Sequence, residues 1–339
     1  MPKRVTISDV AELAGVHKAT VSRALNELTS HQVNTTTARK IQRAAIQLGY
    51  IPNIVARSLR TSLSMTVGVI VPDLTNPLFP PIIRGIENYL TARGYTALLA
   101  NTDGQDRHEE LAFESLLARR VDGFILATGH SQHPLLVDAY HRNIRVVMLN
   151  RGSLQVPYPL VTGDDADGIA AAVDHLAELG HTDILHLAGP QDFSTSHTRA
   201  EAFRSACSAR GLRPRMTVAS ALNVNAGEQS TDAFLRSGKP LPTAIVASND
   251  LLALGALRSL RHHGLDCPSD VSVVGYNDMP FAEDFSPPLT TVRVPHLDLG
   301  SEAARLLMEA ISTEHQIPLT VTLPVSLIVR DSTAPPRDR

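Results

Sequence analysis

The chain has 339 residues, of which 43% are hydrophobic and 19% charged, and its formal net charge is −3. That length and hydrophobic content are enough for two or three compact units with real cores, which excludes a disordered or fibrous chain. Two cysteines imply no disulfide framework, no apolar run approaches the roughly 18 residues of a membrane span, and the N-terminus lacks a signal-peptide core, so we expect a cytoplasmic protein that does not enter a membrane.

The charge is unevenly distributed along the chain. Residues 1–61 contain nine basic and three acidic side chains, a net charge of +6, whereas the remaining 278 residues contain 22 basic and 31 acidic ones, a net charge of −9. A solvated charged surface does not require such a reversal of sign. A basic head on an acidic body indicates that the head meets a polyanion and the body does not.

The stretch from Thr6 to Leu25 predicts two short helices. Thr6 followed by Asp9 is a capping-box pattern, which starts a helix at the next residue, and Gly15 supplies a turn. A second helix begins near Lys18. Its inner face buries Val21, Ala24 and Leu25, and its outer face carries Lys18, Ala19, Ser22 and Arg23. Such a pair is either a helix-turn-helix, whose second helix enters the DNA major groove, or an ordinary helical hairpin in a larger domain.

A third helix follows a polar stretch, with Asn34 or Thr35 as its cap and Gly49 at its end. The three helices predict a small all-α DNA-binding domain over residues 1–51. Pro52 and Asn53 then break the chain before a linker, residues 52–63, with one or two turns of potential helix and no partner of its own.

From Val67 onward the pattern changes to alternating strands and helices, which predicts parallel sheets covered by helices. The series exceeds a single core, so we expect two sheets side by side, with a ligand cleft beyond the carboxyl ends of the strands. The expected strands are Val67–Val71, Thr96–Ala100, Gly123–Ala127, Arg145–Leu149, Leu160–Thr162, Ile184–Ala188, Val218–Ser220, Ala244–Ala247 and Val271–Val274. The expected helices include Pro81–Arg93, Glu109–Arg119, Ala166–Leu179, Thr198–Arg210 and Leu251–His263.

Three stretches resemble the lactose-repressor family of bacterial transcription regulators: VTISDVAELAGVHKATVSRALN, GYIPNIVARSLRT and VGVIVPDLTNPLF. The similarity extends to about residue 330, through motifs such as Leu179-Gly180-His181 and Ser248-Asn249-Asp250. It implies an α/β periplasmic-binding-protein-like body over residues 64–339, with parallel sheets flanked by helices. One subdomain would hold about 64–163 and 292–323, the other about 164–291 and 324–332, with the chain crossing near Thr162–Asp164, Thr291–Val292 and Pro324.

The resemblance also implies which residues meet DNA. Lys18 and Arg23 fall at base-reading positions and suit guanine edges, while Ala19 offers an apolar contact. The segment 52–63 corresponds to a hinge helix that folds on operator DNA, with Leu59 wedged into a minor-groove step; a plain linker is the alternative. Phosphate contacts are expected from Thr20, Ser22 and Asn26. The full expected set is Thr6, His17, Lys18, Ala19, Thr20, Ser22, Arg23, Asn26, Asn53, Ala56 and Leu59.

Polar side chains where strands end predict an effector site. Carboxylate, amide and guanidinium groups bond hydroxyls directionally, and a ring face stacks on the C–H side of a sugar, so the mixture suits a carbohydrate or similar polyhydroxylated molecule. Arg199 matches the effector-contacting arginine of the family. Asp73, Asn249 and Asp278 have the alternative of serving as cap or turn residues. The expected set is Asp73, Phe79, Asn150, Arg151, Arg199, Asn249 and Asn277.

We therefore expect a sequence-specific, homodimeric transcriptional regulator, in the first place a repressor, that binds a pseudopalindromic operator in double-stranded DNA and responds to a small effector, a sugar or sugar derivative. Induction by the effector is favoured over corepression by a non-sugar ligand. A dimer is favoured over a tetramer because no heptad tail follows the last strand.

Two other classes are weaker. A solute-binding protein would share the body fold but not the basic head. An enzyme would need an acid/base pair or a phosphate cradle, and the chain shows no phosphate loop, GxSxG elbow or HExxH motif. We expect no cofactor, and no metal site, because His130/His133 and His262/His263 lack cysteine partners and the spacing of a structural zinc site.

Overall fold

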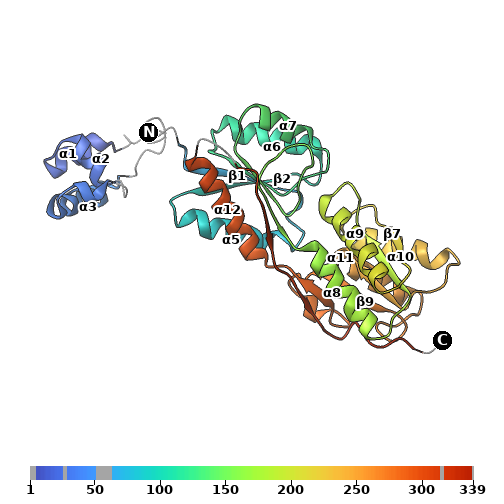
Figure 1. Ribbon diagram of the computed structural model, residues 1–339. Coiled ribbons are helices and arrows are strands. Elements are labelled where there is room, and N and C mark those ends of the chain that lie inside the picture. Colours follow the sequence, from blue (N-terminus) through green and yellow to red (C-terminus); the bar gives the residue numbers. More distant parts are fainter. Residues whose placement is uncertain (1–4, 26–28, 51–62, 314–316, 338–339) are drawn as a thin grey trace. The chain divides into compact units, whose positions relative to one another are not determined.

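The computed structural model describes residues 5–25, 29–50, 63–313 and 317–337 (Figure 1). The chain forms two compact units, Met1–Ser64 and Met65–Arg339. We call the first unit the head and the second the body. Asn26, Asn53, Ala56 and Leu59, which we expect to contact DNA, lie outside the described residues. None of the helices in the described ranges is long and apolar enough to span a membrane.

The head consists of helices α1 (Ile7–Ala14), α2 (Lys18–Ala24) and α3 (Thr35–Leu48), with a 3-10 turn at Ser30–Gln32. Gly15 and Gly49 end α1 and α3 in the left-handed conformation that glycine adopts without strain. Asn34, rather than Thr35, caps α3, its Oδ1 accepting from the Thr36 N–H. The apolar faces of the three helices meet in a small core that contains Val10, Ala11, Ala14, Val21, Ala24, Ile41, Ala44 and Ala45.

The first lobe of the body is a six-stranded sheet in the order β11-β5-β4-β3-β1-β2, with all strands parallel. Helices α5 and α12 pack on one face, and α6 and α7 on the other (Figure 1). Helices on both faces explain why the central strands are apolar throughout rather than alternating. The bounds are β1 Thr66–Val71, α5 Phe79–Thr91, β2 Thr96–Asn101, α6 Asp106–Ala118, β3 Phe124–Leu126, α7 Pro134–His141, β4 Val146–Leu149, β5 Leu160–Gly163, α12 His296–Ser312 and β11 Thr320–Leu323.

The second lobe is another six-stranded sheet, in the order β12-β10-β9-β8-β6-β7. Its strands are parallel except for β12, which runs antiparallel to β10. The bounds are α8 Asp165–Glu178, β6 Ile184–Ala188, α9 Ser194–Ala209, β7 Arg215–Val218, α10 Val224–Arg236, β8 Ala244–Ala247, α11 Asp250–His262, β9 Ser272–Asn277, a 3-10 turn Ala282–Asp284, β10 Thr290–Arg293 and β12 Ser326–Ile328.

The chain passes between the lobes three times, after Gly163, Arg293 and Leu323. The second passage lies later than the sequence indicated, because β10 keeps pairing with β9 as far as Arg293 opposite Asn277.

The prediction of a strand at Val218–Ser220 was wrong in position, since β7 covers Arg215–Val218. The short strands β10, β11 and β12 were not among the expected strands. The residues of β11 are at most half-buried, so it carries little apolar signal. Helix α5 starts at Phe79 rather than Pro81, because prolines are accommodated in a first helical turn.

Candidate DNA-reading helix and effector site

The outer face of α2 is exposed while its inner face is anchored. Val21 and Ala24 are buried in the core of the head. Lys18, Ala19 and Arg23 are exposed. The anchored helix therefore presents two cations and a methyl group to solvent, the groups that read guanine edges and thymine methyls in a major groove.

Two of the residues that we expected to contact DNA, Thr6 and His17, are N-caps of helices. The Thr6 N–H donates to Asp9 Oδ2 at 2.7 Å and the Asp9 N–H donates to Thr6 Oγ1 at 3.4 Å, which closes the capping box in front of α1. The Nδ1 of His17 accepts from the Ala19 N–H at 3.3 Å and caps α2. The imidazole thus acts as the N-cap, as a serine hydroxyl commonly does in other helices.

The body carries its polar candidates where strands end. Asp73 follows β1, Asn150 and Arg151 follow β4, Asn249 follows β8, and Asn277 ends β9. Apart from half-buried Asp73, these side chains are buried. Parallel strands bring their carboxyl ends to one edge of a sheet, so each lobe gathers its candidates at one edge.

Arg199 of α9 forms a buried ion pair with Asp165, the first residue of α8. Arg199 Nη2 lies 2.7 Å and Nε 2.8 Å from Asp165 Oδ1, and Nη1 donates to the Ser248 carbonyl at 2.6 Å. The guanidinium also stacks on the Tyr276 ring, 3.7 Å from its centroid. Burial raises the pKa of the Asp165 carboxyl, and the facing guanidinium counteracts that rise.

Arg151 of the first lobe stacks on Phe193 of the second, with its guanidinium carbon 3.8 Å from the ring centroid. Two neighbouring contacts also join the lobes: the Gly152 N–H donates to Ser194 Oγ and the Ser131 N–H to the Asp192 carbonyl, both at 2.9 Å. The lobes are therefore in contact beside Arg151.

A cavity of about 490 Å³ opens next to this contact, lined by residues from both lobes. His130 in its wall bonds Asp192 Oδ2 through Nδ1 at 3.2 Å, and its ring lies 4.9 Å from that of Phe193. Glu109 and His133 form a buried pair, 3.3 Å apart. The acidic groups deepest in the wall thus have partners within it.

Several residues that the sequence analysis assigned to the effector site also stabilise the fold. Asn249 caps α11, its Oδ1 accepting from the Leu252 N–H at 2.8 Å, and Asp73 accepts from the Thr75 N–H at 2.8 Å. Phe79 is 1% exposed and packs in the core of the first lobe. Its role as a stacking platform for an effector stays a prediction. Asp165, Phe193 and Tyr276 were missed by the sequence reasoning; Asp165 lies three residues after the end of the expected strand Leu160–Thr162, which was the available signal.

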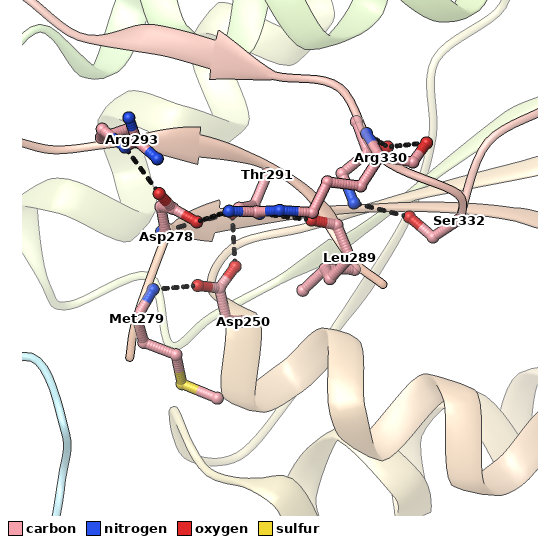
Figure 2. Close-up of polar contacts among 9 residues, drawn as sticks. Asp250, Asp278, Met279, Leu289, Thr291, Arg293, Arg330 and Ser332 are labelled. Atoms are coloured by element: carbon pink, nitrogen blue, oxygen red, sulfur yellow. Dashed lines mark hydrogen bonds and ion pairs between the residues drawn. The ribbon is translucent and has the colours of Figure 1, made fainter. Parts of the chain in front are cut away.

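Asp278, which follows β9, joins the end of β10 to the segment after β12. Its Oδ2 lies 2.6 Å from Arg293 Nε and its Oδ1 lies 2.8 Å from Arg330 Nη2 (Figure 2). Arg330 Nη1 also donates to the Leu289 carbonyl at 2.7 Å. The Asp278 carboxylate thus holds the end of β10 and the segment after β12 to the same lobe.

Asp250, the first residue of α11, is buried below this network. Its Oδ2 accepts from the Met279 N–H at 2.8 Å and its Oδ1 from Thr291 Oγ1 at 2.5 Å (Figure 2). Burial raises the pKa of the carboxyl to about 7, although both hydrogen bonds lower it. The group therefore titrates near neutrality.

A helix-turn-helix head attached to a two-lobed α/β body, with polar groups gathered at the strand ends, defines a DNA-binding regulator that responds to a ligand. Comparisons with known proteins agree with this class. Residues 6–53 match the model of the bacterial regulatory proteins of the lacI family, and residues 173–333 match that of the periplasmic-binding-protein-like domain.

Three known proteins illustrate the similarity. The transcriptional repressor CytR of Escherichia coli K12 is 31% identical over 97% of this chain and 96% of its own. The Lac repressor dimer bound to operator and the anti-inducer ONPF superposes with a TM-score of 0.86 at 31% identity, over 98% of this chain and 100% of that one. A ribose-bound LacI-family regulator of Enterococcus faecalis V583 superposes with a TM-score of 0.70 at 34% identity, over 80% and 99%. The chain belongs to the lacI family of bacterial regulatory proteins, and it is a DNA-binding transcriptional regulator.

Proposed function

We propose that this chain is a homodimeric repressor that binds a pseudopalindromic operator through α2 and releases it when a sugar or sugar derivative binds between the lobes of the body. The observation that carries the DNA-binding part is the exposed face of Lys18, Ala19 and Arg23 on an anchored helix of a head with net charge +6. Support for the dimer and the effector comes from relatives solved as an operator-bound dimer and with bound ribose.

The domain roles follow the same proposal. Residues 1–51 bind DNA, residues 52–63 are the hinge segment, and residues 64–339 bind the effector and dimerise. The two lobes correspond to about 64–163 with 292–323 and about 164–291 with 324–332. Effector binding changes how the lobes are held against each other, which alters operator affinity through a coupling of about 1–3 kcal/mol.

The effector set is Asp73, Phe79, Asn150, Arg151, Arg199, Asn249 and Asn277. The DNA set contains Lys18, Ala19 and Arg23 as base-reading residues, with Thr20, Ser22 and Asn26 on phosphates. Phe79 and Asn249 contribute by shaping the site, because one packs in the core and the other caps α11. No catalytic role is proposed for any residue.

A selection experiment tests the function. Full-length protein is titrated with a library of labelled duplexes at two salt concentrations, with and without pools of sugars and sugar derivatives. We expect a selected palindrome that one pool releases. Binding that depends on salt but shows no sequence preference with any pool would contradict the proposal, since it would make the head an electrostatic anchor only.

A pair of variants with equal charge change tests α2. Lys18→Ala should weaken binding to the selected palindrome by about 10- to 100-fold, since a base contact contributes roughly 1–3 kcal/mol of discrimination. Lys40→Ala, at an exposed position of α3, should affect the palindrome and random DNA equally and weakly. Equal losses of specificity in the two variants would exclude α2 as the reading helix.

A further inference from the structure

Arg151 is a buried cation. It follows β4, is 8% exposed, and stacks on Phe193 of the other lobe. Burial and the nearby positive charge of Arg199 lower the pKa of its guanidinium to about 10. A pKa of 10 still leaves the group charged at neutral pH.

The charge of Arg151 has no counter-ion in the part of the chain that the structure describes. Among the residues that the structure describes, no carboxylate forms an ion pair with it, and its Nε has no hydrogen-bond partner. The nearest acidic influence is Asp192, whose carboxylate is 59% exposed and already bonds His130. Arg199, by contrast, has Asp165 at 2.7 Å. Arg199 is therefore neutralised by a buried carboxylate, whereas the charge of Arg151 is offset only weakly, by a largely exposed one.

A buried, unneutralised charge is costly, and proteins retain one where a ligand supplies the missing partner. The position fits a ligand, because Arg151 shares its sheet edge with Asn150, and its stack on Phe193 lies where the lobes touch. Its neighbour Arg199 is held on the opposite lobe by Asp165 and Tyr276.

We propose that the effector of this regulator is an anionic polyhydroxylated molecule, a sugar acid or a sugar phosphate, whose carboxylate or phosphate group binds the guanidinium of Arg151. This inference rests on the proposed function and specifies the charge of its effector. The hydroxyls of the molecule contact the amides at the strand ends, and the anion gives the guanidinium of Arg151 the buried counter-ion that it lacks. Guanidinium suits either group because its planar donors match two acceptor oxygens.

Matched pairs of probes test the charge. Full-length protein is titrated by calorimetry with glucose, gluconate and glucose 6-phosphate, and with ribose and ribose 5-phosphate. We expect an anion to bind at least about tenfold tighter than the neutral sugar of its pair. The carboxylate and phosphate arms distinguish the two forms of the anion.

Arg151→Met should reduce the affinity for that anion by about 10- to 100-fold and the affinity for the neutral sugar of its pair by clearly less, so that the preference for the anion is lost. Arg213→Met is the matched control, because Arg213 is exposed and the charge change is the same. Retention of the preference for the anion in Arg151→Met would overturn the inference, as would its loss in both variants.

Thermal unfolding of the ligand-free variants provides a second readout. Removing an unneutralised buried charge should raise the Tm of Arg151→Met by about 2–4 °C, whereas a merely structural role for Arg151 predicts a lower Tm. If neutral sugars bind as tightly as the anions and release the operator, the inference is wrong and the proposed function stands. If no probe of either charge binds while the operator is still recognised, the carbohydrate part of the proposed function fails with it.

Discussion

Arg199 and Asp165 form an ion pair that is almost completely buried, at 5% and 7% exposure, and that joins two helices of the same lobe. The carboxylate of Asp165 therefore depends on one guanidinium for its charge balance. This makes the arginine that the family resemblance assigns to the effector also a structural element. Its removal has two effects, which must be separated experimentally.

Arg199→Ala should lower the free energy of unfolding by about 3–5 kcal/mol, because it leaves the Asp165 carboxylate buried without a partner. The double variant Arg199→Met with Asp165→Asn should recover most of that stability, yet still lack the effector response. Arg204→Ala is the control in the same helix; its pair with Glu201 is largely exposed, so its loss should be small. Urea unfolding and operator release measure the two effects, and a fully stable Arg199→Ala would contradict the ion-pair argument.

Asp250 should make stability depend on pH. Its folded-state pKa of about 7 lies above the ordinary value of 3.8, so the native state holds a proton that the unfolded state releases. Stability from this group is present below about pH 4 and is lost as the pH rises to 7. Asp250→Asn, which resembles the protonated acid, should flatten this fall.

Two buried histidines make stability depend on pH in the opposite direction. The contribution of Asp250 is therefore measured as the difference between the variant and the parent. Burial lowers the pKa of His186 and of His296 to about 4, so their contribution is complete above about pH 6.5 and is lost as the pH falls towards 4. Urea unfolding at pH values from 4.5 to 7.5 gives the difference curve. A variant that parallels the parent across this range would show that Asp250 is ionised in the folded protein.

Leu59→Gly should weaken binding to the selected operator more than binding to random DNA. If residues 52–63 act as the proposed hinge, the change would remove its apolar wedge and lower its helix propensity, and both effects would matter only on the specific site. We expect a loss of about 10-fold or more for the operator, measured by competition binding at one salt concentration. Equal losses on both DNAs would mean that residues 52–63 are a plain linker.

Helices α5 and α12 pack closely through two glycines. A Cβ at Gly300 would lie 2.0 Å from the Ile82 carbonyl oxygen, and one at Gly85 would lie 2.0 Å from that of Leu297. Gly300→Ala should force the helices apart and cost about 1–3 kcal/mol in urea unfolding. Ser312→Ala, at the exposed end of α12, should stay within about 0.5 kcal/mol of the parent. A neutral Gly300→Ala would show that this packing yields easily.

The sequence predictions were most accurate where neighbouring residues determine the structure. The capping box of Thr6 and Asp9, the left-handed Gly15 and Gly49, and the start of α2 at Lys18 were predicted because neighbouring residues determine them. The apolar central strands were also predicted, since burial on both faces leaves a continuous hydrophobic run.

Partners brought together by the fold were not predicted. The sequence analysis placed Arg151 after a strand and matched Arg199 to a position of the family. No neighbouring residue indicates that Phe193 stacks on Arg151 or that Asp165 neutralises Arg199. Each of those contacts joins residues 34 or more positions apart. Only one of the two arginines has a buried carboxylate beside it, and the proposed charge of the effector depends on that difference. The difference arises from how the helices pack, whereas the sequence pattern identifies the helices only as separate elements.

Asp278 fixes where the body can turn. Its bonds to Arg293 and Arg330 hold the end of β10 and the chain after β12 to the second lobe. A rotation of one lobe against the other would then be absorbed by the short stretches between elements of different lobes: Asp164 before α8, Pro295 before α12, and Pro324 and Val325 between β11 and β12. One carboxylate thus sets the position of the pivot between the two lobes.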